Sequence, residues 1–211
     1  MRTDKQINEI VSRLEAEYPL AECTLDYKKD YELLFSVRLA AQCTDARVNM
    51  VTPALFERFP TLQSFAEASE AEVGEYVRSC GFYNSKARDI VAAAKMLIAD
   101  YGGVVPDTME ELLKLPGVGR KTANLILGDV YKVPGSTVVD THCIRISNRL
   151  GLVDDLKEPE KIERELRKVL PPDKSSDFCH RIVMHGRAVC SARKPDCEAC
   201  CLNDLCQFRE S

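Results

Sequence analysis

The sequence predicts an all-α protein, and three observations lead to this prediction. Apolar residues recur at helical spacing along almost the whole chain of 211 residues. Residues typical of helix starts and ends separate the apolar stretches, and no segment shows a convincing alternation of apolar and polar residues. The β-branched run Thr137-Val138-Val139 is short and isolated, so we interpret it as a buried connection between helices.

Two helices near the N-terminus are each predicted from one apolar face. The residues on these faces are Ile7, Ile10, Val11 and Leu14 in the first helix, and Leu33, Leu34, Val37 and Ala41 in the second. Further along, Ser69 with Glu72 and Thr108 with Glu111 have the spacing of a capping box, which predicts helix starts. The predicted helix ends and breaks lie at Pro19, Pro60, Gly81, Gly102, Pro106, Pro134 and Pro159. The turn at 133–136 is the expected boundary between two helical lobes.

The segment from Leu115 to Asn124 joins a predicted helix at about 108–114 to another at about 120–132. Gly117 and Gly119 allow a tight turn and a close approach to a partner. Amides at the start of the second helix would point outward, where they can hold a phosphate. A bare Gly-x-Gly is typical of an ordinary tight turn. The full Leu-Pro-Gly-Val-Gly context resembles the helix-hairpin-helix motif, which grips the DNA backbone without reading sequence.

Lys121 falls in the first turn of the second helix. The helix dipole there disfavours a positive charge and favours the neutral amine, which is the nucleophilic form. The positive charge of Arg120 would also favour the neutral amine of Lys121 if the two side chains are close in space. Such an amine can attack C1′ of a deoxyribose, displace the base and form a Schiff base that permits strand cleavage. The alternative is a solvated surface lysine.

Asp140 follows the apolar run and precedes a segment with helical spacing that contains Ile144, Ile146 and Leu150. This position predicts an N-cap, whose amide donors keep the carboxylate ionised. A fixed negative charge can stabilise a cationic sugar in the transition state or help to deprotonate a lysine. The capping role and the catalytic role can coexist.

The ten cysteines are unevenly placed, and the C-terminal ones suggest a metal site. Cys190, Cys197, Cys200 and Cys206 give the pattern C-x6-C-x2-C-x5-C. Four thiolates over this stretch can hold zinc or an iron-sulfur cluster, and ligand type alone does not choose between them. Cys201 adjoins Cys200 and competes as a ligand.

Charge and hydropathy limit the classes of function. No apolar run is long enough for a signal peptide or a membrane span, so we expect a soluble cytoplasmic protein without disulfides, associated with the nucleoid if bacterial. The formal net charge of −4 excludes a protein coated in positive charge. Any DNA binding would have to be local, and basic residues outnumber acidic ones between Lys114 and Arg149.

The chain resembles the endonuclease III family of helix-hairpin-helix glycosylases from about residue 5 to 209. Five segments carry the resemblance. They are Ala40-Ala41-Gln42-Cys43-Thr44-Asp45, Cys80-Gly81-Phe82-Tyr83-Asn84-Ser85-Lys86-Ala87, the hairpin with Lys121, Val139-Asp140-Thr141-His142, and the C-terminal cysteines. The resemblance implies a six-helix domain at 23–133 that holds the hairpin, and an iron-sulfur-cluster domain built from 1–22 and 134–211.

The same resemblance implies roles for individual residues. Lys121 would be the Schiff-base nucleophile and Asp140 its catalytic carboxylate, acting on a nucleotide flipped out of the duplex. Gln42 would fill the gap left behind, and Phe82 would wedge into the opposite strand, although the family usually has an aliphatic residue there. The alternatives are a solvated helix-end amide for Gln42 and a core aromatic for Phe82. The remaining expected DNA contacts are Leu115, Gly117, Gly119, Arg120, His142, Arg187, Arg193 and Lys194.

His142 and Arg145 could instead support Asp140 or make buried structural hydrogen bonds. The four cysteines would hold one 4Fe–4S cluster, since their spacing is similar to that of the family and favours Cys200 over Cys201. A metal staple surrounded by solvated charges is the alternative for Arg187, Arg193 and Lys194.

The function implied is that of a monomeric DNA glycosylase and AP lyase that removes oxidised pyrimidines from duplex DNA and also acts on abasic sites. An adenine-specific mismatch glycosylase is the nearest alternative, but it usually lacks the hairpin lysine and has an additional C-terminal domain. A non-catalytic DNA-binding or redox-sensing protein would need neither Lys121 nor Asp140.

Overall fold

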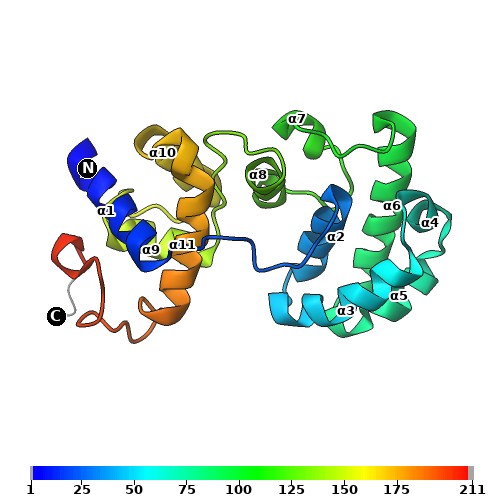
Figure 1. Ribbon diagram of the computed structural model, residues 1–211, viewed down its shortest axis with the longest axis horizontal. Helices are drawn as coiled ribbons and strands as arrows, with labels where there is room; N and C mark the ends of the chain where they lie inside the picture. Colours follow the sequence, from blue (N-terminus) through cyan, green and yellow to red (C-terminus); the bar gives the residue numbers. More distant parts are fainter. Residues whose placement is uncertain (1, 209–211) are drawn as a thin grey trace. The chain divides into compact units, whose positions relative to one another are not determined.

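A computed structural model describes residues 2–208, and helices are its only regular elements (Figure 1). Over these residues no β-strand occurs, which confirms the all-α prediction. The run at 137–139 is a buried connection between helices, as predicted. The chain divides into two compact units, one of residues 23–131 and one of residues 1–22 with 132–211. We call them the central unit and the terminal unit.

The central unit is built around an aromatic core. Its helices are α2 (Asp30–Ala40), α3 (Asp45–Arg58), α4 (Leu62–Glu67), α5 (Glu70–Val77), η1 (Arg78–Cys80), α6 (Tyr83–Tyr101), α7 (Met109–Leu112) and α8 (Arg120–Asp129). Phe65 of α4 is fully buried, and its ring centroid lies 5.0 Å from that of Phe35 and 5.1 Å from that of Phe59. Edge-to-face and tilted contacts of this kind stabilise a core beyond the burial of apolar area. Ser69 and Glu72 form the predicted capping box at the start of α5.

The terminal unit combines the N-terminal helix with the helices that follow residue 132. Its helices are α1 (Asp4–Glu17), α9 (Thr141–Arg149), α10 (Pro159–Val169), η2 (Pro172–Lys174), α11 (Ser175–Ala188) and η3 (Asn203–Leu205). The predicted apolar face of α1 is buried, and α1 packs against α11. Gly186 lets α9 and α11 approach closely, because a Cβ there would lie 2.3 Å from Nδ1 of His142.

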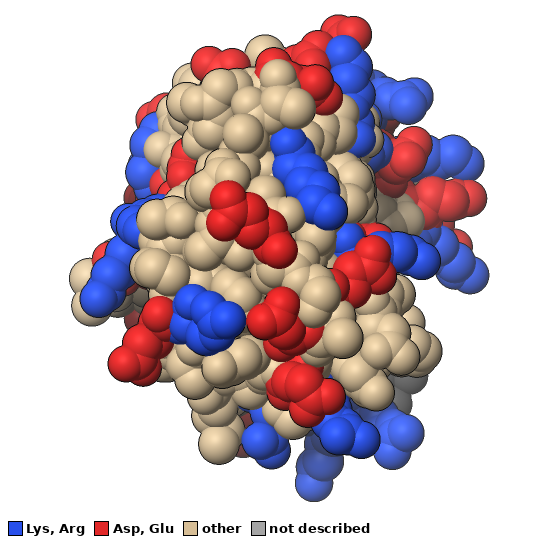
Figure 2. All heavy atoms as spheres, turned by 90° about the vertical axis from the view of Figure 1, so that its right-hand side faces the viewer, with Lys and Arg blue, Asp and Glu red and all other residues tan. Residues whose placement is uncertain are grey.

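The charge pattern of one face agrees with the small negative net charge. Figure 2 views the molecule from the side on which α4, α5 and α6 lie, and acidic and basic side chains are interspersed over this face. Neither sign dominates on this face, so it offers no extended positive surface to DNA.

Within the described part of the chain, no helix combines the length and the apolar character needed to cross a bilayer.

Candidate functional site

The hairpin lies between α7 and α8, and both helices are shorter than predicted. α7 ends at Leu112 rather than near 114. After Leu113 the amides donate to carbonyls only three residues back, Lys114 N to Glu111 O at 3.1 Å and Leu115 N to Leu112 O at 3.2 Å. This tightening precedes Pro116, which disfavours helical geometry in the residue before it. α8 begins at Arg120 as predicted and ends at Asp129 rather than at 132.

Gly117 makes the turn possible. Its φ of +76° lies in the left-handed region, and a Cβ on it would lie 2.6 Å from Nε of Arg38. Arg38 forms a half-buried ion pair with Asp89, at 2.7 Å between Nη2 and Oδ2. The turn therefore rests directly on an ion pair between α2 and α6, and only glycine fits there.

Replacing Gly117 by Ala is expected to lower the free energy of unfolding by about 1–3 kcal/mol, because the new Cβ meets both backbone strain and Arg38. Gly119→Ala is the matched control. Gly119 has a φ of −106° and open space where a Cβ would be, so its stability should remain near that of the wild type. Denaturant melts of the two variants measure the difference, and equal stabilities would contradict this account of the turn.

The side chain of Leu115, an expected DNA contact, is buried. Its side chain is 2% exposed and belongs to the core of the central unit. Its amide donates to Leu112 O, and its carbonyl accepts from Val118 N. The structure gives the side chain of Leu115 a packing role, and its expected contact with DNA stays a prediction. Gly117 and Gly119 are exposed, so their backbone remains accessible.

Lys121 is exposed in the first turn of α8. The opposite face of α8 buries Ala123, Ile126 and Leu127, which anchors the helix in the core. Arg120, beside it in sequence, is half-buried. The lysine thus projects from a rigid element at the exit of the hairpin, in reach of solvent and of a ligand.

Asp140 is the N-cap of α9, which confirms the capping prediction. Its Oδ1 accepts a hydrogen bond of 2.8 Å from Cys143 N. The residue is half-buried at the end of the buried run 136–139. The cap engages one carboxylate oxygen and fixes the side chain at the start of a helix, where a negative charge is favoured.

Gln42 and Phe82 each lie in a tight turn with an unusual backbone. Both are exposed, Phe82 to 70%, and their φ values are 55° and 48°. The core role considered for Phe82 is therefore wrong. Non-glycine residues rarely adopt positive φ, and such strain gathers at functional sites. The sequence does not reveal this feature.

His142 and Arg145 pack against α11 within the terminal unit. Arg145 Nη2 lies 3.1 Å from Nδ1 of His142 and donates to Cys190 O at 2.8 Å. These contacts favour the structural role for Arg145, since its guanidinium links α9 to the end of α11. DNA contact by His142 stays a prediction, as it does for Arg187, Arg193 and Lys194, which are all exposed.

The cysteine pattern folds into one pocket. Its lining includes Cys190, Cys197, Cys200 and Cys206 but not Cys201. Among the described residues, no group of three or more His, Cys, Asp or Glu meets at a single-ion position. Burial raises the pKa of Cys200 to about 11 and also raises that of Cys206, so binding a metal group there must release protons.

Several groups outside the motif contact the sulfurs. Arg149 Nη1 donates to Sγ of Cys190 at 3.2 Å, and its guanidinium lies 4.2 Å from the ring centroid of Phe208. His185 Nε2 lies 3.5 Å from Sγ of Cys200, which also accepts from Leu202 N at 3.4 Å. Arg149 and His185 are not predictable from the cysteine pattern, because only the fold brings them to the cysteines.

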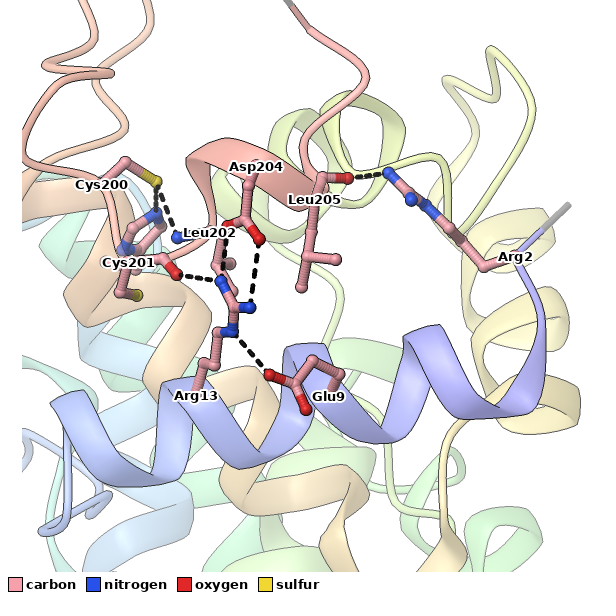
Figure 3. Close-up of polar contacts among 9 residues, drawn as sticks. Arg2, Glu9, Arg13, Cys200, Cys201, Leu202, Asp204 and Leu205 are labelled. Atoms are coloured by element: carbon pink, nitrogen blue, oxygen red, sulfur yellow. Dashed lines mark hydrogen bonds and ion pairs between the residues drawn. The ribbon is translucent and has the colours of Figure 1, made fainter.

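Figure 3 shows how α1 holds the C-terminal segment. Arg13 lies between Glu9 on its own helix and the segment that carries the last cysteines. Its guanidinium donates to the carbonyl of Cys201 at 3.2 Å and, through Nη2, to the carboxylate of Asp204 at 3.1 Å. The N-terminal helix therefore positions the chain between Cys200 and Cys206.

The site thus consists of a glycine hairpin between α7 and α8 and an exposed lysine directly after it. Residues 35–172 match the family described as HhH-GPD superfamily base excision DNA repair protein. Endonuclease III of Synechocystis sp. is 45% identical over 98% of this chain and 94% of its own, and that of Escherichia coli is 38% identical over 96% and 95%. A solved structure of a trapped covalent intermediate between endonuclease III and DNA has a TM-score of 0.91 at 40% identity, covering 98% of this chain and 97% of that one.

The chain belongs to the endonuclease III family. It is therefore a DNA glycosylase with AP lyase activity that acts in base excision repair. A thermostable thymine-DNA glycosylase, at 23% identity and a TM-score of 0.86, shares the fold.

Proposed function

We propose that the protein removes oxidised pyrimidines from duplex DNA through a Schiff base on Lys121 and then cleaves the strand by β-elimination. The observation that carries this proposal is the place of Lys121, exposed in the first turn of α8 directly after the hairpin. A hairpin whose amides hold a backbone phosphate would bring that amine to the sugar of a nearby nucleotide. The covalent intermediate trapped with the similar endonuclease III supports the same chemistry.

In the first step, the neutral amine of Lys121 attacks C1′ as the bond to the damaged base breaks, and the base leaves with the electron pair of that bond and a proton. The sugar ring then opens to a Schiff base between Nζ and C1′. Loss of a proton from C2′ expels the 3′ phosphate, and this step cleaves the strand. Asp140, held by its cap at the start of α9, would supply the negative charge that stabilises the cationic sugar.

Recognition of the damaged nucleotide would depend on local contacts. The backbone at Gly117 and Gly119 would hold phosphate, while Gln42 would hydrogen-bond to the orphaned base and Phe82 would stack in the opposite strand. The exposure of both side chains supports these roles. Positive side chains near the cysteine pocket, on Arg187, Arg193 and Lys194, would add attraction to the DNA backbone.

The four cysteines of the pocket would hold one 4Fe–4S cluster in the terminal unit. Four cysteines that line one pocket suit a polynuclear group, and hydrogen bonds from Arg149 and Leu202 to the sulfurs of Cys190 and Cys200 are typical of such sites. When bound, the cluster supplies a rigid link between the end of α11 and the C-terminal segment. That link would order the loop that presents Arg193 and Lys194.

The ligand set can be tested at the adjacent pair Cys200 and Cys201. Cys200→Ser is expected to remove most of the visible absorbance of the purified protein, because it replaces a thiol that lines the pocket. Cys201→Ser should keep the absorbance, since Cys201 does not line the pocket and contacts Arg13 through its carbonyl. The opposite pattern would reassign the ligand to Cys201.

The substrate is tested by borohydride trapping of the purified protein on two duplexes. One contains thymine glycol and the other contains 8-oxoguanine opposite adenine. A covalent adduct on the first duplex is the expected result. Release of adenine from the second without an adduct would contradict the proposal and favour a mismatch glycosylase. Binding to both duplexes without base release or adduct would also contradict the proposed chemistry.

A further inference from the structure

A buried lysine lies between the two turns that carry Gln42 and Phe82. Lys86 is in the first part of α6 and is only 1% exposed. Its Nζ donates one hydrogen bond to Leu39 O and one to Cys80 O, both at 2.8 Å. Because the acceptors are main-chain carbonyls of two separate segments, a single ammonium group joins the end of α2 to the end of η1.

Burying the positive charge of Lys86 costs free energy. A lysine is almost never fully buried unless it is paired. Burial is the largest influence on the pKa of Lys86 and lowers it, while Cys43 and Cys80 raise it and Arg38 lowers it. The thiol of Cys80 is neutral near pH 7, since burial raises its pKa to about 11, so it forms no ion pair with the ammonium. The two carbonyl groups are therefore the partners that keep the ammonium in the core.

The two joined segments lead directly into strained turns. Leu39 precedes Gln42 by three residues and Cys80 precedes Phe82 by two, and both turn residues have positive φ. Such conformations persist only where the surrounding structure holds them. Phe82 is also held from α6, since its carbonyl accepts from Lys86 N at 3.2 Å. The side chain of Lys86 thus anchors the chain just before Gln42 and just before Phe82, and its backbone amide holds Phe82 itself.

We propose that Lys86 is a positioning residue for extrusion of the damaged base, because it fixes the Gln42 and Phe82 turns at one separation. Both side chains can then enter the duplex together, without first ordering two independent loops. This inference rests on the proposed function, in which Gln42 and Phe82 insert into DNA. Lys86 itself lies in the core and touches neither DNA nor the reacting atoms.

The test compares one substitution in two backgrounds. Lys86→Met keeps the length of the side chain and removes the ammonium. In the wild-type background we expect it to slow single-turnover base release from a thymine glycol duplex by about 10- to 100-fold, because misplacing a contact group by about 1 Å costs this much. In a Gln42→Ala/Phe82→Ala background, the same change should cost less than about 3-fold, since the side chains it positions are gone. Lys95→Met, an exposed lysine on the same helix, controls for net charge and should act like the wild type.

The outcomes separate the inference from the function on which it rests. An equal loss in both backgrounds would make Lys86 merely structural and would overturn the inference, as would no loss in either background. If the Gln42→Ala/Phe82→Ala protein is itself fully active, the insertion roles fail, and the inference fails with them. If thermal melts show that Lys86→Met does not fold, Lys86→Gln replaces it, because glutamine fills similar space with a shorter side chain. This variant is compared in the same two backgrounds, and the same outcomes apply.

Discussion

Lys121→Gln is expected to abolish covalent trapping and to lower strand cleavage at a thymine glycol site by roughly 1,000-fold or more, because the variant lacks the proposed nucleophile. The substitution should leave the fold intact. Lys121 is exposed on α8, and glutamine has a helix propensity close to that of lysine, so stability should change by less than about 0.5 kcal/mol. DNA binding should persist, since the hairpin backbone is unaltered.

Gel analysis after borohydride reduction measures the adduct, and Lys114→Gln is the matched control. Lys114 is an exposed lysine just before the hairpin and pairs with Glu111 at 2.6 Å. The Lys114→Gln protein should form the adduct as the wild type does. An adduct of normal yield with the Lys121 variant would place the nucleophile on another residue and would remove the central step of the proposed mechanism.

The helices were predictable because their signals are local. The apolar face of α1, the capping box at Ser69 and the N-cap at Asp140 each depend on residues within one or two turns of each other. Local hydrogen bonds and helical periodicity suffice to specify such features. The boundaries of α7 and α8 were less predictable, because the tightening before Pro116 shortens a helix that the apolar pattern would continue.

The parts of the site that escaped prediction depend on contacts between distant segments. Lys86 in the sequence is one lysine in a polar run, and only the packing of α6 against α2 places its ammonium on Leu39 O. Arg149 reaches the cysteine pocket in the same way, from α9 to a residue 41 positions later. No pattern in the sequence signals a positive φ at Gln42, since that conformation is imposed by the surrounding structure.

The cysteine motif shows what residue spacing alone does not predict. Its spacing identified four of the pocket-lining residues, but spacing alone could not separate zinc from a cluster, nor exclude Cys201. The structure separates Cys201 from the others because the chain turns there, with its carbonyl bound to Arg13 of α1. A residue 188 positions away in sequence therefore holds the backbone at one of the two adjacent cysteines.

Asp140 should show two separable effects, one on stability and one on catalysis. Asparagine and aspartate are equally good N-caps, whereas alanine is about 1 kcal/mol worse. Asp140→Asn can therefore still accept the hydrogen bond from Cys143 N that Oδ1 accepts in the wild type. It loses only the charge, so the free energy of unfolding should fall by less than about 1 kcal/mol. Asp140→Ala loses both the cap and the charge and should be about 1 kcal/mol less stable than Asp140→Asn.

Base release should respond differently, because the proposed catalytic role needs the negative charge and not the cap. Both variants are expected to release thymine glycol roughly 100- to 1,000-fold more slowly than the wild type, the size of effect seen when one preorganised electrostatic group is removed from an active site. Single-turnover rates beside denaturant melts separate the two contributions. Normal turnover by Asp140→Asn with reduced stability of Asp140→Ala would confine Asp140 to its structural role at the start of α9, and the charge that stabilises the sugar would then have to come from another group.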